Sequence, residues 1–517
     1  MTKLFNLTLS TRKSYGISFI AGCLLALAFA PIHFFLLAII CPALLLYFYL
    51  TSHSTIKIII HAFCFAFGLF LVGVSWVYVA MHDFGNFNLL LSVILTLLFC
   101  LAMAIVFLMQ AIIMLFFRRT HYICQALLVF PASWVIYEWI RSWLFTGFTW
   151  LQLGFSQSDS LLANYYPLIG SYGVTFLLTF SAGLLVIAVV KKNIPRYLAI
   201  LVLLLIWLGG FGLYFVHWTK PANKPTSVNL VQGNIPQSMK WQPETLPSTL
   251  AIYKKLTASH WRRLVVWPEA AIPTIEQAIP HFIDDLSTQA KQHDSTVVTG
   301  IIRVEQSKIF NSAIALGQNS GKYDKRHIVP FGEYTPKLFS MFTKFLDLPK
   351  YNLSSGKDHQ TLIEIDHNPI AILICYEIAY SHLFKIMLPQ ARLLINISND
   401  GWFGRSFASA QQLQMAQVAA SQTGRYLLSV GNNGITAIVD PKGRIIKQVP
   451  RFTRTALTGT ISFMTGSTPW VIIGDWPIIL LMFILLGVAV IISLFYRPSP
   501  LRPFDRLRAS RLRDRKP

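Results

Sequence analysis

Hydrophobic and polar positions divide this chain into two kinds of sequence. Before residue 220, long apolar stretches rich in Leu, Ile, Phe and Val follow one another with short polar breaks. A membrane-spanning helix needs about 20 such residues, and only a helix satisfies its own backbone in lipid. We therefore predict seven spanning helices before residue 220 and one near the end of the chain. They lie at 14–31, 33–51, 58–81, 88–117, 122–140, 162–190, 197–217 and 476–496.

The first apolar stretch also resembles a secretory signal peptide. Basic residues precede it, and it runs to Ala28-Phe29-Ala30, which is similar to a cleavage site. We favour a retained helix, because Pro31 leads straight into the next apolar stretch and the two would form a tight hairpin. The stretch at 88–117 is too short for two spans and is predicted to be one long, tilted helix.

The segment between the seventh and eighth spans has a different pattern. Short β-branched runs alternate with helical patterns, which is typical of an α/β domain with packed sheets. We predict a transmembrane domain at 1–217, an α/β domain at 218–470, a last span at 471–497 and a basic tail at 498–517. The strand-like runs are 227–231, 264–267, 296–302, 311–315, 370–374, 393–397, 426–430 and 435–439, and the helical patterns are 281–292, 378–390 and 408–424.

The charged residues support the division into a membrane part and an outer domain, and they predict how the chain is oriented in the membrane. Only 13% of the residues are charged, against about 25% in soluble proteins. The net charge of +22 lies largely in alternate short loops and in the tail, so we interpret it as membrane topology and not as a nucleic-acid surface. The rule that basic loops stay inside places both termini in the cytoplasm and residues 218–470 outside. The tail either contacts anionic lipid or is only a disordered end after the last span.

One of the six cysteines differs from the others. Five lie in or beside apolar stretches, where a cysteine is a small buried hydrophobe, whereas Cys375 lies in the outer domain. It follows a strand-like run and precedes a helical pattern, a position where amide groups can favour a thiolate. Cys375 is therefore either a reactive nucleophile or a buried structural thiol. Without a CxxC or Cys/His cluster, we expect no metal site.

Two charged residues of the outer domain could assist such a nucleophile. Glu269 ends the strand-like run at 264–267 and could be a desolvated general base, or a solvated turn residue. Lys325 lies in a basic loop and could stabilise a thiolate and an oxyanion, or simply be solvated. Each signal is weak when taken alone.

In the order Glu269, Lys325 and Cys375, these residues resemble the catalytic triad of the nitrilase superfamily. The whole chain up to about residue 497 is similar to one branch of that superfamily, apolipoprotein N-acyltransferase. In the outer domain, the matching segments are Trp267-Pro268-Glu269, 325–333, 375–377, 396–404, 231–237 with Lys240-Trp241, and 431–434. In the membrane part, the matching segments are Glu138-Trp139 and 146–152. Thr149 stands where that branch usually has proline, and Gln412 where histidine is common, which bears only on local loop geometry.

The resemblance implies a fold, a reaction and a location. It implies an eight-helix transmembrane domain plus an α-β-β-α sandwich that faces the periplasm of a bacterial inner membrane. It also implies a monomer without cofactor. In the implied reaction Cys375 takes an acyl chain from a phospholipid, at sn-1 of phosphatidylethanolamine, as a thioester. The α-amine of a diacylglyceryl-cysteine at a lipoprotein N-terminus then accepts the chain, with Glu269 as base and Lys325 at the oxyanion.

The same resemblance assigns supporting roles by position. Glu333 would orient Lys325 or Glu269, and Tyr376 and Glu377 would shape the acyl pocket. Trp241 would gate the lipid entrance, with ordinary aromatic packing as the alternative for Trp241 and Tyr376. The remaining candidates for lipid contact are Trp150 and Phe148, which could equally belong to an aromatic belt.

Three other functions compete with this one. A membrane-tethered amidase or nitrilase would use the same three residues but transfer the acyl group to water, and it would have no use for eight spans. A transporter should carry ionisable residues inside its spans, where this chain has almost none. A non-catalytic scaffold would not need Glu269, Lys325 and Cys375 together.

Overall fold

The computed structural model describes residues 11–85, 87–336 and 352–495. The chain forms two compact units, which are described in turn. Among the described residues, the first unit contains 11–75, Ile94–Phe215 and 475–495. The second unit contains Trp76–Val93 and Val216–Gly474. The short segment 76–93 comes from the predicted membrane part of the sequence.

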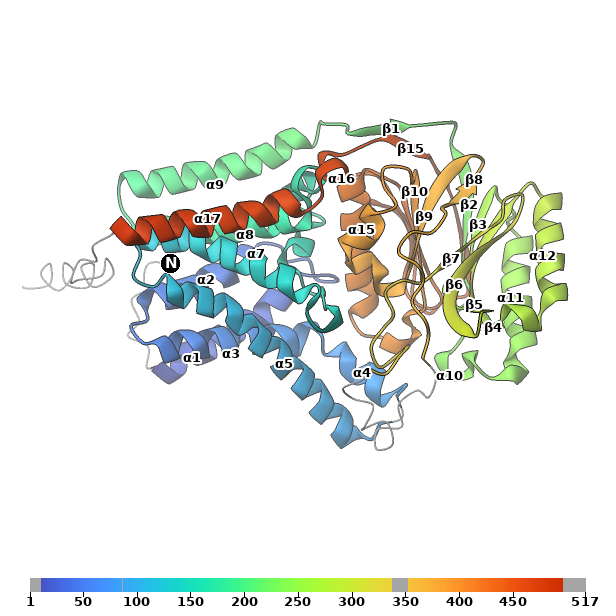
Figure 1. Cartoon of the computed structure of the whole chain (residues 1–517), viewed down its shortest axis with the longest axis horizontal. Coiled ribbons are helices and arrows are strands. Elements are labelled where there is room, and N and C mark those ends of the chain that lie inside the picture. Colours follow the sequence, from blue (N-terminus) through green and yellow to red (C-terminus); the bar gives the residue numbers. More distant parts are fainter. Residues whose placement is uncertain (1–10, 86, 337–351, 496–517) are drawn as a thin grey trace, which may run out of the picture. The chain divides into compact units, whose positions relative to one another are not determined.

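The first unit is helical (Figure 1). Within the described ranges, six helices are long and apolar enough to cross a membrane: Thr55–Gly73, Leu89–Phe116, Tyr122–Arg141, Leu161–Val190, Ile194–Leu213 and Trp476–Phe495. Four of these are the single helices α3, α5, α9 and α17. Tyr122–Arg141 combines α6 (Tyr122–Cys124), the π-helix η2 (Gln125–Val129) and α7 (Phe130–Arg141), and Leu161–Val190 combines the 3₁₀ helix η5 (Leu161–Tyr165) with α8 (Tyr166–Val190). As predicted, α5 is one helix of 28 residues.

The expected eight spanning helices are not confirmed. The first two apolar stretches form α1 (Thr11–Ala26) and α2 (Leu37–Thr51), which have 16 and 15 residues. Residues 27–36 form turns around Pro31, which has no N–H with which to continue a helix. The third stretch is divided into α3 and the separate short helix α4 (Trp76–His82), with a break after Gly73. Hydropathy alone does not show these breaks.

The first unit encloses an apolar core and a buried polar network. Helices α7, α8 and α17 share a core of Ala132, Val135, Ile136, Tyr172, Ile478, Ile479 and Met482. Beside it, the Glu138 carboxylate accepts hydrogen bonds from Trp134 Nε1 (3.1 Å), the Leu153 backbone N–H (2.7 Å) and Thr175 Oγ1 (2.8 Å). Arg141 Nη1 donates to the Trp150 carbonyl at 2.5 Å. These bonds fix the irregular segment that follows α7.

The second unit contains two large β-sheets. One has the strand order β13-β12-β11-β10-β9-β8, and the other has the order β14-β2-β3-β5-β6-β7, with β4 paired to β5. A separate pair joins β1 (Thr219–Pro221) to β15 (Met464–Gly466). The first sheet contains Ile363–Ile365 (β8), Asn368–Ile374 (β9), Leu393–Ser398 (β10), Leu427–Gly431 (β11), Thr436–Val439 (β12) and Ile445–Val449 (β13). The second contains Thr226–Gln232 (β2), Leu264–Val266 (β3), Ile272–Ile275 (β4), Thr296–Glu305 (β5), Lys308–Gly317 (β6), Gly321–Asp324 (β7) and Thr455–Ile461 (β14).

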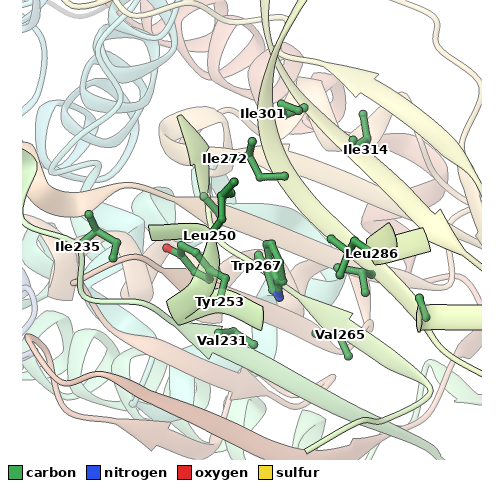
Figure 2. Close-up of a cluster of buried hydrophobic side chains, with 13 residues drawn as sticks. Val231, Ile235, Leu250, Tyr253, Val265, Trp267, Ile272, Leu286, Ile301 and Ile314 are labelled. Carbon is green, nitrogen blue, oxygen red and sulfur yellow. The ribbon is translucent and has the colours of Figure 1, made fainter. Parts of the chain in front are cut away.

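Helices cover the outer faces of the stacked sheets, which gives an α-β-β-α order (Figure 1). Helices α11 (Leu246–Ala258) and α12 (Pro280–Gln292) pack on the sheet that contains β2 and β5. Figure 2 shows their shared core, in which Trp267 lies against Tyr253 with ring centroids 5.1 Å apart. Helix α15 (Ala408–Thr423) covers the other sheet over β11 and β12. The predicted α/β domain is thus confirmed.

All eight strand-like runs of the sequence form strands, and the helical patterns at 281–292 and 408–424 form α12 and α15. The helix predicted at 378–390 is wrong. That segment contains only the end of the 3₁₀ turn Cys375–Ala379 and the five-residue α14 (Ser381–Lys385). Tyr380 has extended backbone angles between them, which interrupts the helix.

The parallel strands determine where the site lies. In one sheet β2, β3 and β5 run parallel, and in the other β9, β10 and β11 do. Parallel neighbours present their carboxyl ends at the same edge of a sheet. Glu269 follows β3, Cys375 follows β9 and Asn399 follows β10, so the polar residues after these strands gather at these ends.

Candidate active site

Cys375 lies at a sharp corner between β9 and a 3₁₀ turn. Its side chain is buried, and its backbone has φ +58°, a left-handed conformation that is rare for a residue with a Cβ. Such strained positions often occur at functional sites, where the surrounding structure holds them. The sequence predicted Cys375 between a strand and a helix. The strand β9 precedes it as predicted, but a 3₁₀ turn follows it in place of the expected helix.

Glu269 is buried and held by three groups. Its Oε1 accepts a hydrogen bond from Asn311 Nδ2 at 2.7 Å, and its Oε2 accepts one from the Asn399 backbone N–H at 2.8 Å. Lys325 Nζ lies 3.5 Å from Oε1. These contacts favour one orientation of the carboxylate and exclude the solvated turn that the sequence left open.

Lys325 follows β7 and is 1% exposed. Its Nζ lies 2.9 Å from Glu333 Oε1, and Asn311 Nδ2 donates to that same oxygen at 2.8 Å. Burial opposes the charge of Lys325, but the carboxylates of Glu333 and Glu269 outweigh it and raise the pKa above its ordinary value. Lys325 is thus a permanent cation between two carboxylates, and not a solvated loop residue.

The surroundings of the Cys375 thiol disfavour its ionised form. Burial raises its pKa well above the ordinary value, and Glu269 raises it further, while Lys325 opposes the shift. A buried thiol of this kind reacts only when a neighbouring base removes its proton. The site therefore combines a thiol, a fixed carboxylate and a fixed cation.

Glu377 connects the segments that carry Lys325 and Cys375. Its Oε1 accepts hydrogen bonds from the backbone N–H groups of Arg326 (2.8 Å) and His327 (3.0 Å). Its Oε2 accepts one from the Ile374 N–H at 2.8 Å, and Tyr323 OH lies 3.2 and 3.1 Å from the two oxygens. Burial raises the pKa of Glu377, although the backbone N–H groups oppose the shift. Its carboxylate faces the backbone of both loops.

The remaining predicted residues occupy varied environments. The Tyr376 ring centroid lies 5.9 Å from Lys325 Nζ, and the Trp241 side chain is 48% exposed. Trp150 and Phe148 belong to the first unit, where their stacked rings lie 6.3 Å apart. Trp150 is only 2% exposed and packs in the interior of that unit.

Sequence reasoning did not single out Asn311, Asn399 or Lys240. Asn399 and Lys240 lie inside segments that were already noted, but an isolated amide or lysine gives no signal of burial. Lys240 Nζ donates to the Glu269 carbonyl at 3.0 Å, and Asn399 Nδ2 donates to Gln237 Oε1 at 2.8 Å. Across the described residues, no group of three or more His, Cys, Asp and Glu side chains could hold a metal ion.

Comparisons with known proteins now bear on this geometry. Residues 21–184 match the family described as apolipoprotein N-acyltransferase N-terminal domain, and residues 227–468 match carbon-nitrogen hydrolase. The chain is 41% identical to the apolipoprotein N-acyltransferase of Coxiella burnetii over 479 residues, which covers 91% of this chain and 99% of that one. It is 37% identical to that of Methylococcus capsulatus, over 92% of this chain and 95% of that one.

Solved structures are more distant. The CN-hydrolase superfamily protein XC1258 from Xanthomonas campestris is 18% identical, with a TM-score of 0.36. The match covers 46% of this chain and 91% of that one. An amidase from Nesterenkonia sp. is 12% identical, with a TM-score of 0.33 and coverages of 46% and 90%.

Proposed function

The chain belongs to the apolipoprotein N-acyltransferase family, and from that premise we propose that Cys375, Glu269 and Lys325 transfer the acyl chain in two steps through a thioester. The observation that carries the proposal is the buried Glu269 carboxylate, fixed 3.5 Å from the Lys325 ammonium in the same site as the buried Cys375 thiol.

In the first step Glu269 accepts the proton of the Cys375 thiol. The sulfur attacks the ester carbonyl at sn-1 of phosphatidylethanolamine, and Lys325 with backbone N–H groups beside Cys375 stabilises the oxyanion. Collapse of this intermediate breaks the ester bond and expels the lysophospholipid oxygen, which takes the proton from Glu269. The acyl chain remains on Cys375 as a thioester.

In the second step the α-amine of a diacylglyceryl-cysteine attacks the thioester. Glu269 accepts a proton from the amine, the carbon–sulfur bond breaks, and the proton returns to the sulfur. The products are a triacylated lipoprotein and the free thiol. The raised pKa of Cys375 supports this assignment, because a protonated thiol needs a base in every cycle. No cofactor takes part.

Supporting residues follow from the same geometry. Glu333 orients Lys325 through its 2.9 Å contact, and Glu377 holds the Lys325 and Cys375 loops together. Tyr376 lines the acyl pocket beside Lys325, and Trp241 gates the lipid entrance because its ring is exposed next to α10 (Gln237–Lys240). Phe148, which is partly exposed, contacts lipid, and the buried Trp150 supports its ring by stacking on it.

The six apolar helices and the relatives fit a bacterial inner-membrane protein. We propose that the catalytic unit is periplasmic and that both termini are cytoplasmic, because the basic loops alternate along the helical part. A membrane site suits two lipid substrates, since moving an acyl chain into water costs about 0.8 kcal/mol per CH₂. We also propose that the protein acts as a monomer.

The decisive experiment uses the purified chain in detergent micelles with a phospholipid labelled in its sn-1 chain. Mass spectrometry would detect a labelled thioester on Cys375, with Cys375→Ala as the control, before a diacylated lipopeptide is added. Transfer of the label to the α-amine of the peptide supports the acyltransferase. Loss of the label to water despite the peptide favours a hydrolase, and absence of any adduct on the folded protein refutes the catalytic assignment.

A further inference from the structure

Lys240 is a second buried lysine in the catalytic unit. It ends α10 and is 1% exposed. Within the described ranges, no Asp or Glu oxygen lies within 4.0 Å of its ammonium, in contrast to Lys325. Removing an ammonium from water without a paired carboxylate costs several kcal/mol. A lysine buried in this way lowers the stability of the fold, which points to a role other than stabilisation.

The hydrogen bonds of α10 suggest that role. Lys240 Nζ donates to the main-chain carbonyl of Glu269 at 3.0 Å. From the other end of α10, Gln237 Oε1 accepts a hydrogen bond from Asn399 Nδ2 at 2.8 Å. The backbone N–H of Asn399 in turn donates to Glu269 Oε2 at 2.8 Å. One short helix thus contacts the main chain of Glu269 directly and its carboxylate through one intermediate.

The main chain at Glu269 needs such support. The next residue, Ala270, has φ +46°, a strained conformation that is uncommon for a residue with a Cβ. On the other side, a Cβ at Gly300 would lie 2.4 Å from the Ala270 nitrogen, so only glycine lets β5 approach this closely. The Lys240 hydrogen bond therefore acts on a strained turn that carries the general base.

The charge of Lys240 also affects the site. Burial lowers its pKa to about 7, while nearby Glu269 and Cys375 act to raise it. The other charged groups around the base and the thiol are Lys325, 3.5 Å from Glu269, and the carboxylates of Glu333 and Asp400. Glu333 lies 2.9 Å from Lys325, and Asp400 interacts with both Glu269 and Cys375. Protonated Lys240 would favour the thiolate form of Cys375.

We propose that Lys240 is a positioning residue of the acyl-transfer centre, which holds the strained main chain at Glu269 and couples the base to the helix that ends at Trp241. This inference rests on the proposed function of Glu269. It adds a link between the base and the exposed Trp241 ring, so that movement of α10 changes the position of the base.

The test compares Lys240→Met with Lys240→Arg and with Lys255→Met, a matched change of an exposed lysine on α11. Single-turnover formation of the Cys375 thioester is measured in micelles against phospholipid concentration and against pH across neutrality. Methionine keeps most of the side-chain volume and removes a buried charge, so we expect Lys240→Met to fold, which its unfolding temperature checks.

We expect Lys240→Met to acylate Cys375 about 10- to 100-fold more slowly, with half-saturation by lipid unchanged, because the base is misplaced while lipid binding is not. Its pH profile should lose the component near pH 7, and Lys240→Arg should recover part of the rate. A folded Lys240→Met with the wild-type rate and pH profile would overturn the inference. Failure of the wild-type protein to form any thioester would instead overturn the proposed function itself.

Discussion

The substitution Glu377→Gln tests whether one buried carboxylate holds the catalytic loops together. Glu377 is fully buried and accepts hydrogen bonds from three backbone N–H groups and from Tyr323. A glutamine has the same shape, but one of its two acceptor oxygens becomes an NH₂ donor. If the glutamine oxygen faces Arg326 and His327, it keeps both of their hydrogen bonds. The side-chain NH₂ then faces the Ile374 N–H, so that two donors lie against each other.

The expected cost follows from these contacts. A hydrogen bond to a charged group contributes about 1.5–3 kcal/mol, and a buried N–H left without an acceptor costs about 1–3 kcal/mol. Burial raises the pKa of Glu377, so desolvation already offsets part of the carboxylate's contribution. We therefore expect a loss of about 2 kcal/mol in the stability of the catalytic unit. A shift of about 1 Å in either loop would slow acylation by about 100-fold.

The assay combines thermal unfolding in detergent with single-turnover thioester formation. Glu364→Gln is the matched control, because Glu364 is exposed on β8 and should change neither quantity. If Glu377→Gln acylated Cys375 at the wild-type rate and unfolded at the wild-type temperature, the role of Glu377 as a clamp would be refuted.

Three further predictions concern the groups around the site. Asn311→Ala removes the N–H group that contacts both Glu269 (2.7 Å) and Glu333 (2.8 Å), and should slow thioester formation at least about tenfold. Burial raises the pKa of Asp400 from 3.8 to about 6, so its contribution to stability is full below about pH 4 and is lost, by about 3 kcal/mol, as pH rises through 6. Asp400→Asn should therefore unfold at a higher temperature than the wild type above pH 6 and at a similar temperature near pH 4. Arg303→Met leaves Asp324, 2.7 Å from the buried guanidinium, without its cation and should cost about 3 kcal/mol in thermal unfolding.

Each of these predictions has a contrary result. Undiminished acylation by Asn311→Ala would mean that Lys325 and the Asn399 N–H suffice to hold Glu269. An Asp400→Asn variant that showed the wild-type pH dependence of unfolding would assign that dependence to another group. For Arg303→Met, an unchanged unfolding temperature would mean that solvent already screens its three carboxylates, Glu276, Glu305 and Asp324.

The strands could be predicted from the sequence because their signal is local. Runs such as Ile370–Ile374 are continuous and β-branched, and they end at turn residues, so each identifies a buried strand without knowledge of its neighbours. The helical unit was harder to predict. Hydropathy marks apolar residues but not the turns that end α1 before Pro31 or interrupt the chain after Gly73. In place of eight predicted spans, the described part of the chain therefore has six long apolar helices and several shorter ones.

The site, too, has residues that the sequence identifies and contacts that it does not. Glu269, Lys325 and Cys375 could be named because each ends a recognisable strand or begins a distinctive motif. The contacts of Asn311 and Asn399 with Glu269 could not, since they join residues 42 and 130 positions apart. Lys240 was hidden for another reason. A lysine beside a turn is usually solvated, and only the packed structure shows that its ammonium is enclosed.

The pairing of β14 with β2 has a consequence for how the protein is made. These strands pair along their whole length, from Thr455 with Gln232 to Ile461 with Thr226. β2 is the first long strand of the catalytic unit to leave the ribosome, and its partner β14 is the last long strand, more than 220 residues later. Until β14 emerges, β2 presents an open edge on which other chains can add strands. Assembly of this sheet is therefore completed only when nearly the whole chain has been synthesised.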